Sequence, residues 1–148
     1  EARWQLVRAV VDAVTVPVVV NGDIVDPASA QEALRQSGAA AVMIGRGAQG
    51  KPWIVGQVGA ALAGGSAPPA PRGVELADLV GEHYEAMLDA YGTHIGLRVA
   101  RKHLDWYLEA AGIILDRDTR RQLLGSESTD AVLELIPAIF AGGWRQAA

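Results

Sequence analysis

The sequence contains no cysteine among its 148 residues. This absence excludes a disulfide framework, a zinc site with cysteine ligands and a thiol nucleophile within these residues. Aromatic residues are few, at 5%, and no apolar run approaches the roughly 18 residues that span a membrane. The formal net charge of −4 argues against indiscriminate nucleic-acid binding but leaves room for a local basic patch. The chain opens on Glu1, with no initiator methionine or leader, and we expect a piece of a longer protein.

Half of the residues are apolar, which is enough for a buried core. Two short apolar runs, Val16–Val20 and Ala40–Ile44, are predicted strands, each ending in a glycine-containing loop. Helices are predicted before, between and after them, over residues 3–14, 27–37 and 52–63. Strands that are apolar on both faces belong to a parallel sheet covered by helices. Because two strands do not make a stable sheet, we expect the missing strands in sequence outside this chain or, as the less favoured alternative, in another copy of it.

The second half of the chain is predicted to be all helical. Residues 66–73 form a proline-rich linker that propagates neither helix nor sheet. Glycines that follow the linker separate four predicted helices, over residues 74–91, 93–111, 116–124 and from 128 or 129 to about 140. This pattern is typical of a four-helix bundle. Trp144, near its end, is expected to pack in the core or at the terminus.

The loops that follow the two predicted strands carry the strongest functional signal. They read Asn21-Gly22-Asp23 and Gly45-Arg46-Gly47. In parallel α/β folds, ligands bind at the carboxyl ends of strands, where free backbone N–H groups and helix N-termini meet. Glycine lets a phosphate approach the backbone and arginine offers a charged fork. The spacing alone leaves two interpretations open, a phosphate site or two tight turns with a surface arginine.

Motifs in both halves resemble one enzyme family, the tRNA-dihydrouridine synthases. Three segments resemble the end of its flavin-binding barrel: Val16–Ile24, Gly38–Gly47 and Gly50–Ile54. Three more motifs resemble the signature of its helical C-terminal domain: Tyr91-Gly92, Gly96 and Arg98–Leu108. The resemblance is nearest to the bacterial B-type branch, also called nitrogen-regulation proteins. It implies the C-terminal quarter of a TIM (β/α)8 barrel over residues 1–65, the linker 66–73 and a helical tRNA-binding domain over 74–148.

The resemblance implies a flavoenzyme that reduces uridine to dihydrouridine in the tRNA D-loop. NADPH would reduce FMN, the flavin would pass hydride to the base, and a cysteine on a mobile loop would protonate the other carbon. The residues that match the family's FMN site are Asn21, Gly22, Asp23, Gly45 and Arg46. We expect Arg46 to neutralise the phosphate and Asp23 to face ribityl hydroxyls or brace the loop, since a carboxylate would repel a phosphate. With no cysteine here, the catalytic acid is expected outside this chain, which alone should be inactive and hold FMN weakly or not at all.

The predicted helix 93–111 carries a cationic face. Arg98, Arg101 and Lys102 fall in one sector, with His103 toward another side. The resemblance implies that the first three contact tRNA phosphates and that His103 stacks or hydrogen-bonds near the RNA. The other interpretation is a solvated face on which Arg101 and Asp105 form an ordinary i,i+4 pair. Residues 74–148 hold seven Lys and Arg against twelve Asp and Glu, so RNA binding requires segregated charges.

Two other functions stay open at this point. Another FMN barrel dehydrogenase, of the dihydroorotate or dihydropyrimidine type, would share the strands and glycine-rich loops, whereas the Arg98–Leu108 motif has no counterpart there that we know of. The chain could also act as a non-catalytic RNA-binding module. No metal site is expected, since His83 and His94 have no third ligand in view, and each is expected at the surface or at a cap. We expect tRNA as the partner, no membrane, a cytoplasmic location, and dimerisation or segment swapping through exposed strand edges.

Overall fold

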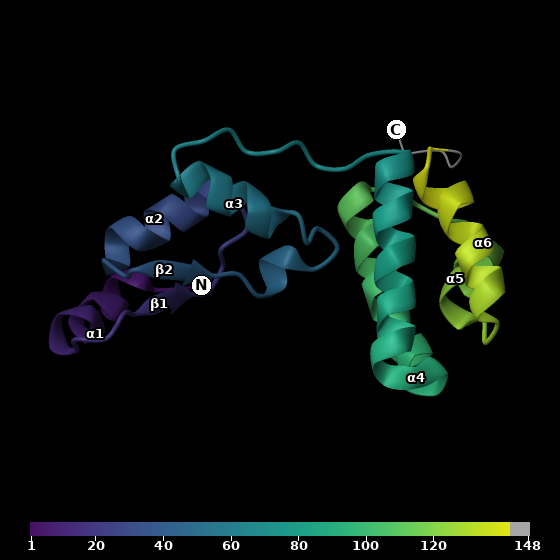
Figure 1. Cartoon of the computed structure of the whole chain (residues 1–148), viewed down its shortest axis with the longest axis horizontal. Coiled ribbons are helices and arrows are strands. Elements are labelled where there is room, and N and C mark those ends of the chain that lie inside the picture. Colours follow the sequence, from purple (N-terminus) through teal and green to yellow (C-terminus); the bar gives the residue numbers. More distant parts are fainter. Residues whose placement is uncertain (143–148) are drawn as a thin grey trace. The chain divides into compact units, whose positions relative to one another are not determined.

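A computed structural model describes residues 1–142 of the chain, so Trp144 lies outside the described residues. The chain divides into two compact units, Glu1–Ala70 and Pro71–Ala148 (Figure 1). The first unit combines helices with a small sheet, and the described part of the second is helical. The chain is therefore a mixed α/β protein that is mostly helical. No helix in the described part is both long and apolar enough to cross a membrane.

The first unit alternates helices with two short strands. Its elements are the 3₁₀ helix η1 (Trp4–Val7), α1 (Arg8–Ala13), β1 (Val19–Asn21), α2 (Pro27–Ser37), β2 (Ala41–Met43), the 3₁₀ helix η2 (Arg46–Ala48) and α3 (Ile54–Leu62). The strands pair in parallel, with Val20 opposite Val42. A right-handed crossover through a helix is the usual connection between such strands, and α2 supplies the helix here. The carboxyl ends of both strands thus lie at the same edge of the sheet.

Helix α2 has a sequence-encoded start. The Asp26 carboxylate accepts a hydrogen bond from the Ser29 backbone N–H at 2.7 Å, and the Ser29 hydroxyl accepts one from the Asp26 N–H at 3.1 Å. This reciprocal pair is a capping box, and Pro27 occupies the first helical turn. Gly38, with φ 67°, ends the helix in the left-handed conformation that glycine adopts without strain. The predicted helix boundaries at Pro27 and Ser37 are confirmed.

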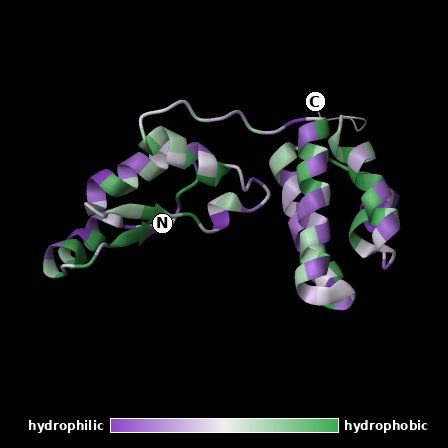
Figure 2. Ribbon diagram, viewed as in Figure 1, coloured by the Kyte–Doolittle hydropathy of each residue, from purple (hydrophilic) through white to green (hydrophobic). Residues whose placement is uncertain are grey.

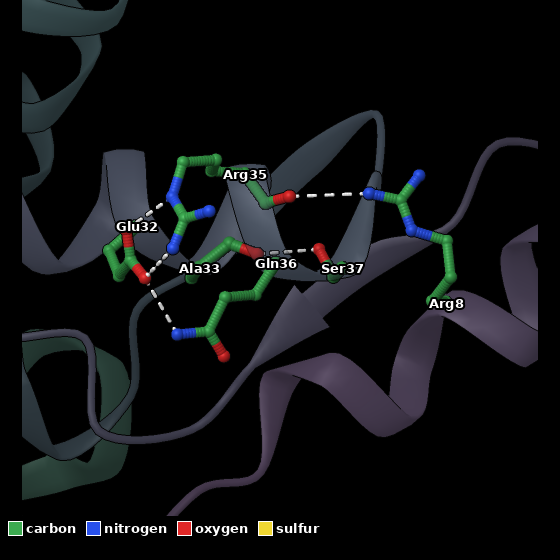
Figure 3. A network of polar contacts seen from close by, with 6 residues as sticks. All are labelled: Arg8, Glu32, Ala33, Arg35, Gln36 and Ser37. Atoms are coloured by element: carbon green, nitrogen blue, oxygen red, sulfur yellow. Dashed lines mark hydrogen bonds and ion pairs between the residues drawn. The ribbon is translucent and has the colours of Figure 1, made fainter.

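Polar contacts fasten the last turns of α2 to α1 (Figure 3). The Arg8 guanidinium donates a hydrogen bond to the Arg35 carbonyl at 3.2 Å. A cation is favourable there because the last carbonyls of a helix are unpaired and carry partial negative charge. Glu32 pairs with Arg35 and accepts a hydrogen bond from Gln36, and these bonds lower the pKa of Glu32 to about 2. The start of the chain is thereby tied to α2.

The core of the first unit lies on one face of the sheet. Helix α2 contacts both strands, η1 and α3. The buried core residues are Val20, Ile24, Ala30, Ala33, Ile54 and Val58. The side chains of Val19 and Met43 are 54% and 53% exposed, although both strands are apolar in Figure 2. Within the described residues, this second face of the sheet is therefore exposed.

Both predicted strands are shorter than expected, and one predicted helix is divided. The strand predicted over Val16–Val20 begins only at Val19, because Pro17 lacks the N–H that a strand ladder requires. The second predicted strand loses Ala40 and Ile44 at its ends. The helix predicted over residues 3–14 divides into η1 and α1.

The second unit contains α4 (Val74–Ala111), α5 (Arg117–Gly125) and α6 (Thr129–Phe140). Helix α4 is bent at Gly92, whose φ of 71° and ψ of 161° are not helical. Asp116 and Ser128 cap the next two helices with side-chain oxygens. The bend makes two segments of α4, residues 74–91 and 93–111, which match the predicted helices. The two segments are separate helices joined at Gly92, which with α5 and α6 makes four helices in the described part of this unit, and their arrangement as a four-helix bundle is not confirmed.

The helices of the second unit enclose an apolar core. Helix α4 contacts α5 and α6, which also contact each other. The predicted stripe of Leu97, Leu104 and Leu108 is buried, as is Leu123 of α5. Gly96 allows the two segments of α4 to approach closely, because a Cβ there would lie 2.9 Å from the Leu88 Cα. The stripe prediction is confirmed.

Candidate functional site

The two loops after the strands border one pocket at the carboxyl edge of the sheet. The pocket is lined by Asn21, Gly22, Asp23, Ile24, Val25, Gly45, Arg46, Gly47 and Lys51. All five residues that the resemblance assigns to FMN are among them. The structure thus brings together side chains that lie more than twenty positions apart in the sequence. Parallel pairing of β1 and β2 is the cause, since it sets both strand ends side by side.

The Asn21-Gly22-Asp23 loop is held in an uncommon conformation. Gly22 has φ 112°, and Asp23, with φ 51°, is the one non-glycine residue with positive φ within residues 1–142. The Asn21 side-chain oxygen accepts a hydrogen bond from the Gly22 N–H at 2.7 Å. From the start of the chain, Trp4 Nε1 donates to the Gly22 carbonyl at 2.8 Å and the Ala2 N–H donates to the Asp23 carboxylate at 2.7 Å. The loop is therefore braced by residues that precede β1.

Arg46 reaches Asp23 across the pocket. The distance from its Nη2 to the Asp23 Oδ1 is 3.3 Å, and the two side chains are 85% and 41% exposed. Exposed ion pairs contribute about 0–1 kcal/mol. An anionic ligand can therefore compete with Asp23 for the guanidinium at little cost. The Asp23 carboxylate thus contacts both the Ala2 backbone and Arg46, while its role toward a cofactor stays a prediction.

The Gly45-Arg46-Gly47 loop leaves backbone uncovered. A Cβ at Gly47 would lie 2.1 Å from the Ile24 carbonyl oxygen, so only glycine fits where these two loops touch. At Gly45 a Cβ would meet nothing within 4 Å, so the space beside that residue is open. Absent side chains at such positions allow a ligand to approach the main chain.

Lys51 is a second cation of this pocket that the sequence analysis did not single out. It lies in the segment after Gly50, five positions beyond Arg46, and it forms no ion pair within residues 1–142. The Asp26 pKa is lowered, mainly by hydrogen bonds from Ser29 and to a smaller extent by the charge of Lys51. The pocket suits a phosphate-bearing ligand. It offers two cations, Arg46 and Lys51, and exposed backbone at Gly45, while its carboxylate, Asp23, already pairs with Arg46.

The residues expected to bind RNA divide into two groups on α4. Arg98 and Arg101 border a pocket together with Glu127. Arg101 donates from Nη2 to the Gly125 carbonyl at 3.5 Å, and its buried Nε has no hydrogen-bond partner among the described residues. The alternative interpretation placed Arg101 in an i,i+4 pair with Asp105, but Asp105 pairs with Arg120 of α5 instead. A tertiary contact thus replaces the local i,i+4 pair.

Lys102 and His103 belong to a group of ring side chains. Lys102 Nζ lies 5.2 Å from the centroid of the Trp106 ring, a cation–π distance. The His103 ring meets the Trp106 ring and the His83 ring edge to face, each with centroids 5.0 Å apart. His83 Nδ1 lies 2.9 Å from the Tyr107 hydroxyl oxygen, within hydrogen-bonding distance. We call His83, His103, Trp106 and Tyr107 the ring cluster.

Burial sets the protonation of the ring cluster. It lowers the pKa of His83, and it is the main cause of the lowered pKa of His103, to which the charges of His83 and Lys102 also contribute. The same desolvation raises the pKa of Tyr107 to about 12. The imidazoles are therefore neutral at pH 7 and the phenol keeps its proton.

The prediction of His83 at the surface or at a cap is wrong. His83 is half-buried and contacts residues 20 and 24 positions later, across the bend at Gly92. No local pattern signals such a contact. His94 is exposed, and no three His, Asp or Glu side chains in the described residues are placed to hold a metal ion.

Comparisons with known proteins identify relatives of both units. The family model described as dihydrouridine synthase (Dus) matches residues 1–139. A probable tRNA-dihydrouridine synthase of Rhodobacter capsulatus is 53% identical over 140 residues, which are 95% of this chain and 42% of the relative. The tRNA-dihydrouridine synthases B of Xanthomonas axonopodis pv. citri and Yersinia pestis are 42% and 40% identical over 94% and 95% of this chain, and over 41% and 43% of their own lengths. The chain thus spans about two fifths of the length of these curated relatives.

Proposed function

We infer the function from one premise: this chain belongs to the dihydrouridine synthase family. We propose that it serves a flavin-dependent tRNA-dihydrouridine synthase that reduces uridine in the tRNA D-loop. Residues 1–65 would form the C-terminal quarter of a TIM barrel, 66–73 the linker and 74–148 a tRNA-binding domain. The catalytic cysteine would lie in the three fifths of the enzyme that the chain does not supply. The relatives are named tRNA-dihydrouridine synthases, which favours tRNA over orotate or a free pyrimidine as the substrate.

The pocket at the carboxyl edge of β1 and β2 is the observation that carries this proposal. Arg46 and Lys51 supply positive charge at its rim, and Gly45 leaves the backbone beside it accessible. We propose that these residues hold the phosphate of FMN and that Asn21 and Gly22 contact its ribityl arm. Bound flavin would supply the hydride chemistry, with NADPH as the reductant. The role of this chain is to bind and orient the anionic end of the cofactor.

We propose that the second unit binds the tRNA substrate. Arg98, Arg101 and Lys102 would contact phosphates, and the neutral His103 imidazole would donate or accept a hydrogen bond near the RNA. Three of the seven basic residues of this unit lie on the second segment of α4, which also carries Asp105 and Glu109. Because the unit as a whole is acidic, RNA binding would depend on these three side chains.

The cofactor half of the proposal is tested in an enzyme that carries these residues together with the regions found only in the relatives. Arg46→Ala should lower FMN affinity by roughly tenfold or more, because a charge-assisted bond to phosphate contributes about 1.5–3 kcal/mol. Riboflavin, which has no phosphate, should bind equally to both forms. Arg35→Ala is the matched control, since Arg35 pairs with Glu32 outside the pocket. Unchanged FMN affinity in Arg46→Ala would refute the phosphate role.

The RNA half is tested by the double substitution Arg98→Ala/Lys102→Ala. Binding of an unmodified tRNA transcript should weaken, and the slope of its salt dependence should become shallower by roughly one to two, because two phosphate contacts are lost. FMN affinity should stay unchanged. Equal tRNA affinity of both proteins across salt concentrations would contradict the contact role.

A further inference from the structure

The ring cluster connects the core of the second unit to a surface cation. At its inner end, Tyr107 is 2% exposed and packs edge to face on Phe140 of α6, with ring centroids 6.5 Å apart. At its outer end, the Lys102 ammonium lies over the Trp106 ring. Between them stand two imidazoles, His83 and His103, in edge-to-face contact. Each contact in the series fixes the orientation of the next ring.

His83 is the link that joins the two segments of α4 in this series. It lies on the segment before Gly92, whereas the other three rings lie on the segment after it. Its hydrogen bond to Tyr107 anchors the imidazole to a buried residue of the second segment. The His103 ring is half-buried and stands between the rings of His83 and Trp106.

A packing role alone does not account for this arrangement. An apolar side chain at position 83 would fill the same space without the cost of desolvating an imidazole. Lys and His side chains have many rotamers, and ordering them on binding costs free energy. A scaffold that holds them in advance avoids part of that cost when RNA binds.

We propose that His83 is a positioning residue for RNA binding, which acts through Tyr107, His103 and Trp106 to hold His103 and Lys102 in place. This inference rests on the proposed function, because it assumes that Lys102 and His103 contact tRNA. Neither His83 nor Tyr107 needs to touch the RNA. Their removal should therefore weaken binding while all four residues expected to contact RNA remain present.

Two substitutions break the hydrogen bond from opposite sides. Tyr107→Phe removes one hydroxyl, and His83→Phe keeps a ring of similar size but removes the nitrogen partner. The matched control is Tyr84→Phe, on the residue next to His83. The Tyr84 hydroxyl is also buried, and it has no hydrogen-bond partner among the described residues. The same chemical change there should leave RNA binding unchanged.

The measurement is the dissociation constant of the 148-residue chain for an unmodified tRNA transcript, by fluorescence anisotropy, at a temperature where every variant is folded. Tyr107→Phe and His83→Phe should each weaken binding roughly fivefold, the factor expected for one hydrogen bond. The double variant should be no weaker than either single one, since both remove the same link. The indole N–H resonance of Trp106 should shift in both variants and not in Tyr84→Phe.

Lys102→Ala is the reference variant that distinguishes a failure of this inference from a failure of the proposed function. If Lys102→Ala weakens tRNA binding while Tyr107→Phe and His83→Phe bind like the wild type, the positioning role of His83 is wrong and the proposed tRNA contact of Lys102 is retained. If Lys102→Ala binds tRNA like the wild type, the proposed tRNA contact of Lys102 is wrong, and the positioning role of His83 is wrong with it. Reduced thermal stability without a change in affinity would show that His83 only packs.

Discussion

At the scale of single residues, the two histidines of the ring cluster make stability depend on pH. Their pKa values in the folded chain are lowered, chiefly by burial, below the value of about 6.5 that they have when unfolded. Between the folded and unfolded pKa values, the unfolded chain therefore binds more protons than the folded one. The free energy of unfolding must then rise with pH in this range and fall as the solution is acidified below about pH 6.5.

We expect His83→Gln to reduce this pH dependence. Urea unfolding of the wild type should give a lower free energy of unfolding at pH 5 than at pH 7, and the variant should lose less over the same interval. Carboxylates contribute to both proteins, so the difference between them reports His83. Equal losses in the two proteins would mean that His83 titrates like an exposed histidine.

Residue patterns predicted the members of the pocket better than they predicted tertiary partners. Asn21 and Arg46 were found because glycine-rich loops after strands have a recognisable composition. Lys51 was missed, because a lone cation near the start of a helix is common on any surface. The pairing of Asp105 with Arg120 and of His83 with Tyr107 depends on how helices meet, and no local spacing encodes that.

At the scale of elements, the bend of α4 depends on Gly92. Its φ of 71° and ψ of 161° lie in a region that other residues adopt only with strain. Gly92→Ala should lower the free energy of unfolding by about 1–3 kcal/mol. The measurement is urea unfolding monitored by circular dichroism.

Gly81→Ala is the control on the same helix. Gly81 is helical, and a Cβ there would meet nothing within 4 Å. Alanine should therefore stabilise the helix by about 0.5–1 kcal/mol. If the two substitutions change stability in the same direction, the bend does not require glycine.

Helix boundaries were predictable because they are encoded by caps and glycines within a few residues. Asp26, Asp116 and Ser128 each cap a helix with a side-chain oxygen, and Gly38 and Gly112 end helices in the left-handed conformation. Strand ends are less local, since they depend on which backbone groups find a partner. Gly92 likewise separates the two segments of α4, where the sequence predicts the end of a helix.

At the scale of the whole molecule, the sheet of the first unit predicts self-association. Its two strands each have one unpaired edge within the described residues, and Val19 and Met43 present exposed apolar side chains. Open edges and apolar faces favour pairing with another chain. Light scattering after size exclusion should give a mass above the 15.5 kDa of one chain, rising with concentration.

A charge on the exposed face should suppress this association. Val19→Lys should shift the chain toward the monomer, whereas Ile114→Lys, at a position 67% exposed in the second unit, should not. A monomeric wild type at every concentration would show that the exposed edges do not pair.

The barrel itself was not predictable from two strands. Periodicity gives a parallel strand pair with a crossover helix, and open sheets and closed barrels share that unit. The resemblance of the loops and of Arg98–Leu108 to one family favours a closed barrel, which the strand pattern alone does not distinguish from an open sheet. Family membership is confirmed by comparison, while the assignment of particular residues to FMN and tRNA stays a prediction.

The bond from Trp4 to the Gly22 carbonyl has an optical consequence. It places an indole fluorophore against the loop that would contact the ribityl arm of the flavin, with Nε1 2.8 Å from the Gly22 carbonyl oxygen. Indole emission overlaps flavin absorption, so excitation energy passes between them over short separations. Emission from Trp4 should dim as the pocket fills, and Trp4→Phe should abolish that part of the signal. Trp4 fluorescence should therefore report whether flavin occupies the pocket, without an added label.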